Sequence, residues 1–200
     1  MFAAIHTALE RLSRVCVWIG GAALLLSAVM VTVDVLARKI FSVTMSGSDE
    51  ITGYVFAAAT TWAYSYCILH RANIRIDAFY NFLPIGVRAL MDIVGLALLL
   101  LFMGMLTKSS VDVFVTSYVQ NSFSVTTLSV PLWIPQAFWL FGLVFFIVTI
   151  VFLLLYSITA LLRGDLKTVQ SIAGTLSVEE EISEETKGMD VARNPNDGSV

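Results

Sequence analysis

Four long apolar stretches, separated by short polar ones, dominate the sequence. They lie at about residues 15–37, 51–69, 88–108 and 132–162. Each holds about twenty or more residues with few charges, and a helix needs about 20 apolar residues to cross the ~30 Å hydrocarbon core of a bilayer. The pattern predicts an all-α integral membrane protein with four transmembrane helices.

The segments beside these stretches are amphipathic and predict short elements at the membrane surface. In residues 1–14, apolar side chains recur at helical spacing opposite charged ones, which predicts an interfacial helix. A cleavable signal peptide is disfavoured, because the apolar run that follows is too long and lacks a small-x-small cleavage site. Residues 70–88 predict a short interfacial helix or an extended turn, since a lone strand in lipid leaves backbone groups unsatisfied. The third stretch stays mildly apolar past its end, and we expect its helix to reach about Tyr118.

The fourth stretch is longer than a bilayer requires. Residues 132–162 carry no charge, and 31 residues at ~1.5 Å each exceed the hydrocarbon core. Either this helix tilts or its first part is interfacial. Pro131 and Pro135, with Trp133 and Trp139 as interface anchors, favour the second interpretation.

Composition agrees with a membrane protein. The chain has 200 residues, of which 58% are hydrophobic and 14% charged, and its mean hydropathy is +0.83. Soluble domains carry about 25% charged residues. The net charge of -3 comes from the end of the chain, because residues 169–200 hold seven of the fifteen acids. We expect this acidic stretch to be a disordered cytoplasmic tail. No basic patch suggests a nucleic-acid partner.

Basic residues near the ends of the four stretches predict the orientation. If the N-terminus is inside, seven bases flank the spans on the inner side: Arg11, Arg14, Arg71, Arg75, Arg88, Arg163 and Lys167. Three flank them on the outer side, namely Arg38, Lys39 and Lys108. This excess predicts that both termini are cytoplasmic.

Charged residues at the span ends are the candidate interaction residues with a partner protein or lipid headgroups. They are Asp34, Arg38, Asp49, Glu50, Arg71, Arg75, Asp77, Arg88 and Asp92. Two pairs among them, Asp34 with Arg38 and Arg88 with Asp92, are four residues apart and can form ion pairs on a helix.

Two of these groups have a local explanation and an intermolecular one. An acid near the bilayer needs a partner, so Asp34 either pairs with Arg38 at the interface or contacts another subunit. Asp49 and Glu50 suit the positive N-terminal end of the second helix, or they contact a partner protein. Ser46 or Ser48 is the expected cap of that helix.

No pattern for catalysis or cofactor binding is present in the sequence. Cys16 and Cys67 stand alone, without a CxxC pair. His6 and His70 lie at span ends, so no pair of histidines is placed to bind a haem. There is no P-loop, GxSxG or HExxH motif. We therefore expect no enzyme activity, cofactor or metal, and interpret the chain as a membrane scaffold or accessory subunit. A membrane anchor of a respiratory oxidoreductase and a self-sufficient small transporter remain as alternatives.

Three blocks carry a resemblance to a known family. They are Arg38 and Phe41 followed by Asp49 and Glu50; Trp62 followed by HRANIRID at residues 70–77 and by Leu83 and Pro84; and Leu128 followed by PLWI at residues 131–134 and by Gly142. Over roughly residues 10–165 the chain resembles the small membrane subunit of tripartite ATP-independent periplasmic (TRAP) transporters, the DctQ-like family.

The resemblance implies a role in uptake across a bacterial inner membrane. A periplasmic substrate-binding protein would deliver an organic anion, often a carboxylate, to a large DctM-like membrane subunit driven by a sodium gradient. The small subunit would brace the large one. Arg71, Arg75 and Asp77 would then lie at the cytoplasmic interface, against lipid headgroups or the partner.

Overall fold

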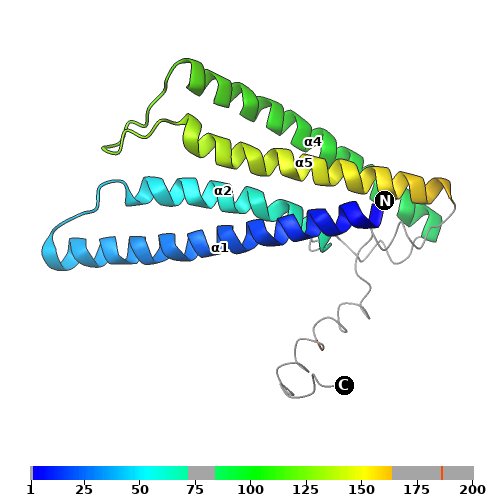
Figure 1. Cartoon of the computed structure of the whole chain (residues 1–200), viewed down its shortest axis with the longest axis horizontal. Helices are drawn as coiled ribbons and strands as arrows, with labels where there is room; N and C mark the ends of the chain where they lie inside the picture. Colours follow the sequence, from blue (N-terminus) through cyan, green and yellow to red (C-terminus); the bar gives the residue numbers. More distant parts are fainter. Residues whose placement is uncertain (1, 72–83, 164–185, 187–200) are drawn as a thin grey trace.

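The computed structural model describes residues 2–71, 84–163 and 186, and this part of the chain is helical (Figure 1). Its long helices are α1 (Phe2–Phe41), α2 (Ser48–Leu69), α4 (Ile85–Val119) and α5 (Trp133–Leu162). Three segments are long and apolar enough to cross a membrane: Ala4–Phe41, Gly86–Val119 and Trp133–Leu162. The predicted all-α membrane class is confirmed to this extent.

The predicted fourth membrane crossing concerns α2. This helix is not among the three that hydropathy and length select. Its more polar composition has a structural reason, because Thr61 and Ser65 are buried between helices. The crossing by α2 stays a prediction. The acidic tail at 169–200 and the surface element around 70–88 fall largely outside the described residues.

Three of the predicted stretches match helices closely, while the first is longer than expected. α4 ends at Val119, close to the predicted Tyr118, and α5 begins at Trp133 between the two prolines. Proline is tolerated there because the first turn has no intrahelical acceptor for its missing N–H. α1 runs unbroken from Phe2 to Phe41, so no break separates the expected surface segment from the first span.

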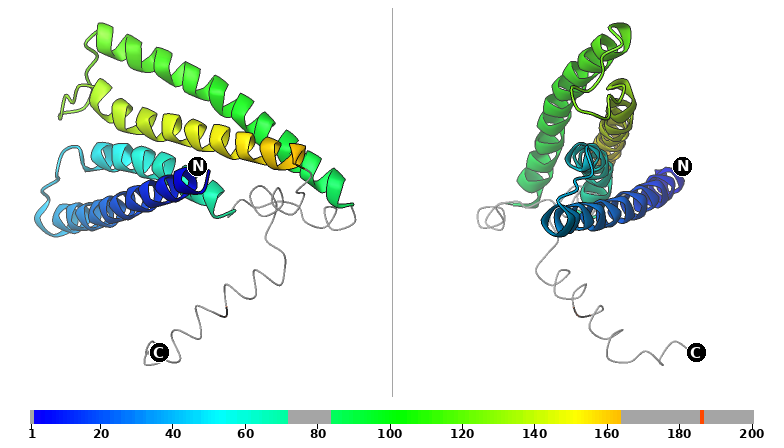
Figure 2. Two further views of the ribbon diagram at one scale, coloured as in Figure 1. Left: turned by 45° about the vertical axis from the view of Figure 1, so that its right-hand side comes forward. Right: turned by 90° about the vertical axis from the view of Figure 1, so that its left-hand side faces the viewer.

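The four helices pack in the order α1–α2–α5–α4, with α1 and α4 on the outside (Figures 1 and 2). α1 is antiparallel to α2, and α4 is antiparallel to α5. The α1–α2 connection and the α4–α5 connection therefore lie at the same end of the molecule. This placement brings together two loops that are about 80 residues apart in the sequence.

α1 and α2 approach closely because α1 presents small side chains to its neighbour. Ser13, Gly20, Ser27 and Asp34 recur every seven residues and are all buried. A repeat of seven keeps one seam facing a partner helix. A Cβ atom at Gly20 would lie 3.2 Å from Ala59 Cα, so the two backbones are in van der Waals contact there. Small residues at such seams are typical of helix pairs in membranes.

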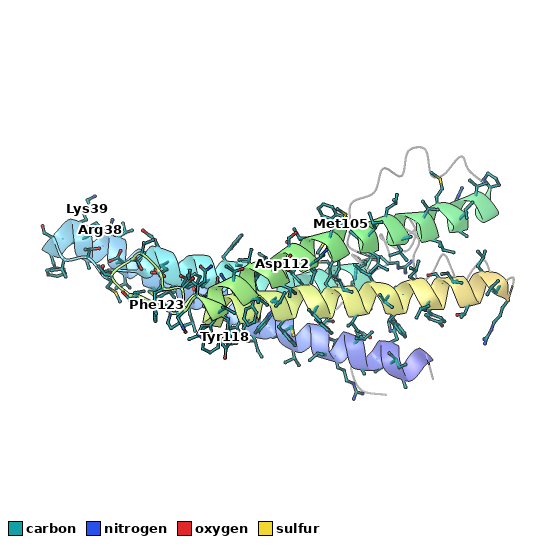
Figure 3. All side chains as sticks on the ribbon, turned by 90° about the horizontal axis from the view of Figure 1, so that it is seen from above. Arg38, Lys39, Met105, Asp112, Tyr118 and Phe123 are labelled. Atoms are coloured by element: carbon teal, nitrogen blue, oxygen red, sulfur yellow. The ribbon has the colours of Figure 1, made fainter. Side chains whose placement is uncertain are left out.

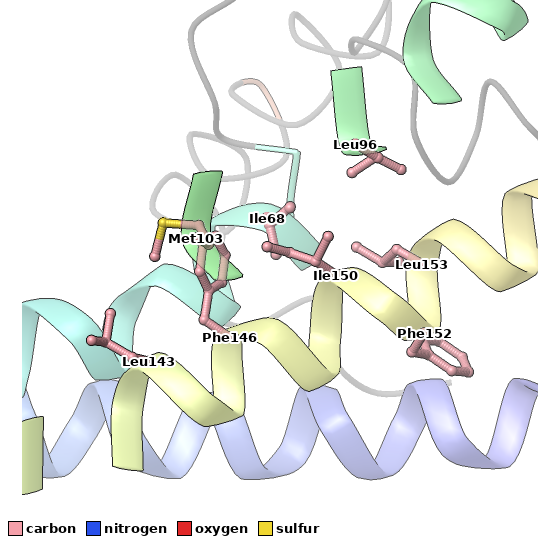
Figure 4. Close-up of a cluster of buried hydrophobic side chains, with 8 residues drawn as sticks. All are labelled: Ile68, Leu96, Met103, Leu143, Phe146, Ile150, Phe152 and Leu153. Carbon is pink, nitrogen blue, oxygen red and sulfur yellow. The ribbon is translucent and has the colours of Figure 1, made fainter. Parts of the chain in front are cut away.

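The apolar core is built around α5. Five of the eight residues in the main buried cluster come from this helix, and they meet Ile68 of α2 and two residues of α4 (Figure 4). Ile150 of α5 has no exposed surface. Gly142 gives a second close approach, because a Cβ there would lie 2.7 Å from Thr61 Cβ. α5 thus holds the α1–α2 pair and α4 in one unit.

Candidate interaction site

Asp34 is the centre of a polar cluster at the end of α1. Its side chain is 2% exposed, although the residue lies in an apolar helix. Oδ1 accepts a hydrogen bond from the Met45 backbone N–H at 2.5 Å, and Oδ2 accepts one from Ser48 Oγ at 3.0 Å. The Arg38 guanidinium completes the cluster at 2.7 Å. The carboxylate therefore ties the end of α1 to the start of α2.

The start of α2 differs from the prediction that Ser46 or Ser48 caps it. The N-cap is Gly47, with φ of 98° and no side-chain cap hydrogen bond. Ser48 is instead the first helical residue, and its hydroxyl donates to Asp34. The capping prediction was wrong because a buried acceptor from the neighbouring helix binds the hydroxyl. Asp49 and Glu50 do lie in the first turn, as expected.

Glu50 joins α2 to the α4–α5 connection. Its Oε1 accepts a hydrogen bond from Tyr54 at 2.5 Å, and its Oε2 accepts one from the Thr126 hydroxyl. Hydrogen bonds from Ser124, Thr126 and Tyr54 lower the pKa of the Glu50 carboxyl below its usual value, because each donor favours the charged form. Glu50 is thus held as a carboxylate by a residue of its own helix and by the α4–α5 connection.

The two connections also touch through neighbouring residues. Ser46 Oγ is hydrogen-bonded to Thr127 Oγ1. Leu128 packs against Gly47, where any Cβ atom would clash with its side chain. A hairpin-like turn presents these residues, since Ser124 N–H donates to the Val130 carbonyl at 2.9 Å and Leu132 N–H donates to that of Ser122 at 3.0 Å. We call the set Asp34, Ser46, Glu50, Thr126 and Thr127 the loop junction.

Basic side chains lie beside the loop junction. Arg38 and Lys39 are together at the end of α1, at the same end of the molecule as Phe123 of the α4–α5 connection (Figure 3). The Arg38 side chain is 56% exposed even though one of its nitrogens binds Asp34. This end of the molecule therefore offers cationic and hydroxyl groups to a headgroup or a protein partner.

The remaining predicted residues that the structure describes are not part of the loop junction. Asp49 is exposed, and Arg71 follows the end of α2 with φ of 53°. Asp92 is 3% exposed on α4, and Arg88 is half-buried one turn before it. The Arg88–Asp92 pair stays a prediction. Arg75 and Asp77 lie outside the described residues.

Sequence reasoning missed Thr126 and Thr127 of the loop junction, and Tyr54, which donates to Glu50. Tyr54 follows Glu50 by four residues, so its contact could have been found from helical spacing. The two threonines lie in a polar connection and gave no signal. Among the described residues, no group of three or more His, Cys, Asp and Glu is placed to hold a metal ion.

The fold and the position of this site define a multi-pass membrane protein with both of its described helical connections joined at one end. Residues 27–161 match the family described as tripartite ATP-independent periplasmic transporters, DctQ component. The match covers more than half of the chain, and the chain belongs to this family. It is therefore a TRAP transporter small subunit and an inner-membrane protein. No curated protein and no solved structure matches it.

Proposed function

We propose that this chain braces the large DctM-like subunit of a TRAP transporter that imports organic anions, and that the chain does not itself bind the substrate. Carboxylates are the expected cargo and a sodium gradient the expected driving force. A periplasmic binding protein would deliver the anion. Family membership supports the transport role, and the packing of the helices supports the bracing role.

The observation that carries the proposal is the open arrangement of the helices. α1 and α4 are the outer members of the row, and each packs mainly on one neighbour. Each presents large apolar side chains outward, such as Leu26 on α1 (71% exposed) and Leu101 on α4 (63% exposed). A broad apolar face of this kind suits packing against another membrane protein as well as lipid.

The middle of the helices adds a second argument. Residues 93–107 and 132–162 carry no charged side chain. Transport sites within membranes are usually marked by charged residues or by helices broken at Gly or Pro near the midplane. Asp34 and Glu50 lie near helix ends and bind groups of their own chain. Substrate and sodium sites are thus expected in the large subunit.

The loop junction would face the periplasm if both termini are cytoplasmic. The excess of basic residues at the opposite helix ends supports this orientation. Arg38 and Lys39 would then lie on the side where the binding protein arrives. Arg71, Arg75 and Asp77 would lie at the cytoplasmic surface.

Co-expression with the large subunit tests the proposal. We expect the tagged chain to co-purify with it in mild detergent in a defined ratio. A photo-crosslinking amino acid at Leu26 or Leu101 should capture the large subunit from at least one of these exposed positions. The same probe at Ile150, which is fully buried, is the matched control and should capture nothing.

Two outcomes would contradict the bracing role. The large subunit could catalyse uptake in membrane vesicles at the full rate without this chain. Alternatively, this chain could purify alone and give substrate flux in liposomes, which would make it a transporter by itself.

A further inference from the structure

An apolar groove runs between α1, α2 and the start of α5. Its volume is about 340 Å³. Its lining includes four small residues of α1 and α2, namely Gly20, Ala23, Ala58 and Ala59, together with the larger Ile19 and Phe138. Ile19 and Phe138 are each 54% exposed, so the groove opens on the surface of the molecule. It belongs to neither the loop junction nor the exposed faces of α1 and α4.

We propose that this groove binds one acyl chain of a membrane phospholipid. Two of the three elements that line it, α1 and α5, are long and apolar enough to span a bilayer. The medium at the open side of the groove is therefore lipid hydrocarbon. The aromatic residues along it turn only apolar surface inward, because Tyr54 donates its hydroxyl to Glu50 and Trp62 donates its Nε1–H to the Phe138 carbonyl.

The dimensions fit a hydrocarbon chain better than a protein helix. The lining residues of α2 run from Ile51 to Trp62, which is roughly 17 Å at ~1.5 Å per residue. A volume of about 340 Å³ along that length leaves a mean cross-section of roughly 20 Å². A helix with its side chains is ~10–12 Å wide and does not enter such a space. Cavities of roughly 150 Å³ hold a benzene-sized ligand, so this one admits a longer hydrocarbon.

α1 and α2 cannot close the groove by moving toward each other. Gly20 and Ala59 already touch, so α1 cannot move closer to α2 along this seam. An empty groove would leave its lining without packing contacts on one side. An acyl chain supplies those contacts and links α1 to α5, which otherwise share little surface.

One end of the groove suits the head of the same lipid. Ile51 and Val130 line that end and are close in sequence to Glu50 and Thr126 of the loop junction. The lining is apolar along its length and polar groups begin at this end. An amphiphile has the same distribution, with an apolar tail and a polar head.

Photolabelling of the full chain in lipid nanodiscs tests the proposal. The nanodiscs would contain a phospholipid with a diazirine in its acyl chain, and the labelled residues would be mapped by mass spectrometry. We expect enrichment of label on Ala58, Ile134 and Phe138 over the exposed α4 positions Leu98 and Leu101. Label distributed over all exposed apolar residues in proportion to their exposure would overturn the proposal.

Filling the groove gives the matched comparison. Ala23→Phe places a ring in the groove and should remove the label from its lining. Ala22→Phe adds the same ring one residue away, on an exposed position, and should leave the label in place. Ala58→Phe fills the groove from α2 and repeats the test if Ala23→Phe fails to fold. Unchanged labelling of the lining in a folded groove-filling variant would overturn the proposal. If neither variant folds, the distribution of label on the wild-type protein decides.

Discussion

Asp34 is a buried carboxylate whose acceptor sites are used by its own chain. A charged side chain within a membrane helix is costly unless it is paired and hydrogen-bonded. Here the donors include Arg38, Met45 and Ser48, and they come from the end of α1, the connection and the first residue of α2. Asp34 therefore has a structural role in fixing the α1–α2 turn.

Replacing this carboxylate should destabilise the protein. In Asp34→Asn, the amide NH2 replaces an acceptor oxygen and faces either the Met45 N–H or the Arg38 guanidinium, so that one of these donors loses its acceptor. We expect a clear fall in the thermal unfolding temperature in detergent. Arg38→Gln should cost less, because the Arg38 side chain is 56% exposed and a surface pair contributes little.

Asp49→Asn is the control for these variants. Asp49 is an exposed acid in the first turn of α2, next to Ser48. The unfolding temperature of Asp49→Asn should stay close to that of the wild type, because an exposed charge at a helix N-terminus contributes only about 0.3–1 kcal/mol. An Asp34→Asn protein as stable as Asp49→Asn would show that the buried cluster does not hold the turn together.

Glu50 makes the stability of the contact between α2 and the α4–α5 connection depend on pH. Its pKa is lower in the folded protein than the usual value of about 4.3, because Ser124, Thr126 and Tyr54 hydrogen-bond to the charged form. Ionised Glu50 therefore stabilises the folded protein fully at pH values above the usual pKa of about 4.3. This stabilisation is lost as the pH falls below that value toward the lower pKa of Glu50 in the folded protein. Thermal unfolding of the wild type between pH 7 and pH 3.5 should show this loss.

Glu50→Gln separates this effect from general acid denaturation. The variant should be less stable than the wild type at pH 7, and the difference between the two should shrink as the pH falls below about 4.3. A constant difference across the whole range would mean that ionisation of Glu50 does not stabilise the junction.

Among the helices, α1 and α2 show how a seam of small residues sets the distance between two backbones. Gly20 lies against Ala59, whereas Gly21 has open space where its Cβ would be. Gly20→Leu should force the helices apart and cost about 1–3 kcal/mol of unfolding free energy, the usual range for overpacking. Gly21→Leu should cost little. Denaturation in mixed micelles measures both, and equal stability of the two variants would refute the close packing.

The sequence allowed the helices to be predicted better than their ends. Hydropathy located the stretches that became α2, α4 and α5, because apolar residues dominate their lengths. Hydropathy alone ended the third apolar stretch at Lys108, but the mildly apolar residues after it predicted a helix to about Tyr118, and α4 ends at Val119. It also separated residues 1–14 from the first span, whereas the helical backbone is continuous there. Solvent preference and helix formation are different properties, and hydropathy reports only the first.

For the whole molecule, helix order and long-range contacts were beyond prediction from one sequence. The pairing of Asp34 with Arg38 followed from their spacing of four residues. The contacts of Glu50 with Thr126 and of Ser46 with Thr127 did not, because they join connections about 80 residues apart. They depend on α5 lying between α2 and α4, and nothing in the pattern of any single helix encodes that order.

A cysteine pair tests this arrangement and the orientation together. Because Ser46 and Thr127 are in contact, Ser46→Cys with Thr127→Cys should form a disulfide under mild oxidation once Cys16 and Cys67 are replaced by alanine. With both termini cytoplasmic, each single cysteine should react with a membrane-impermeant maleimide in intact spheroplasts. Met105→Cys with Thr127→Cys is the control, since Met105 points outward on α4 and should not crosslink. If the pair crosslinks efficiently but the single cysteines are labelled only in inverted vesicles, the loop junction is supported and the predicted orientation is wrong. If the pair does not crosslink, the two connections are not in contact and the helix order is refuted.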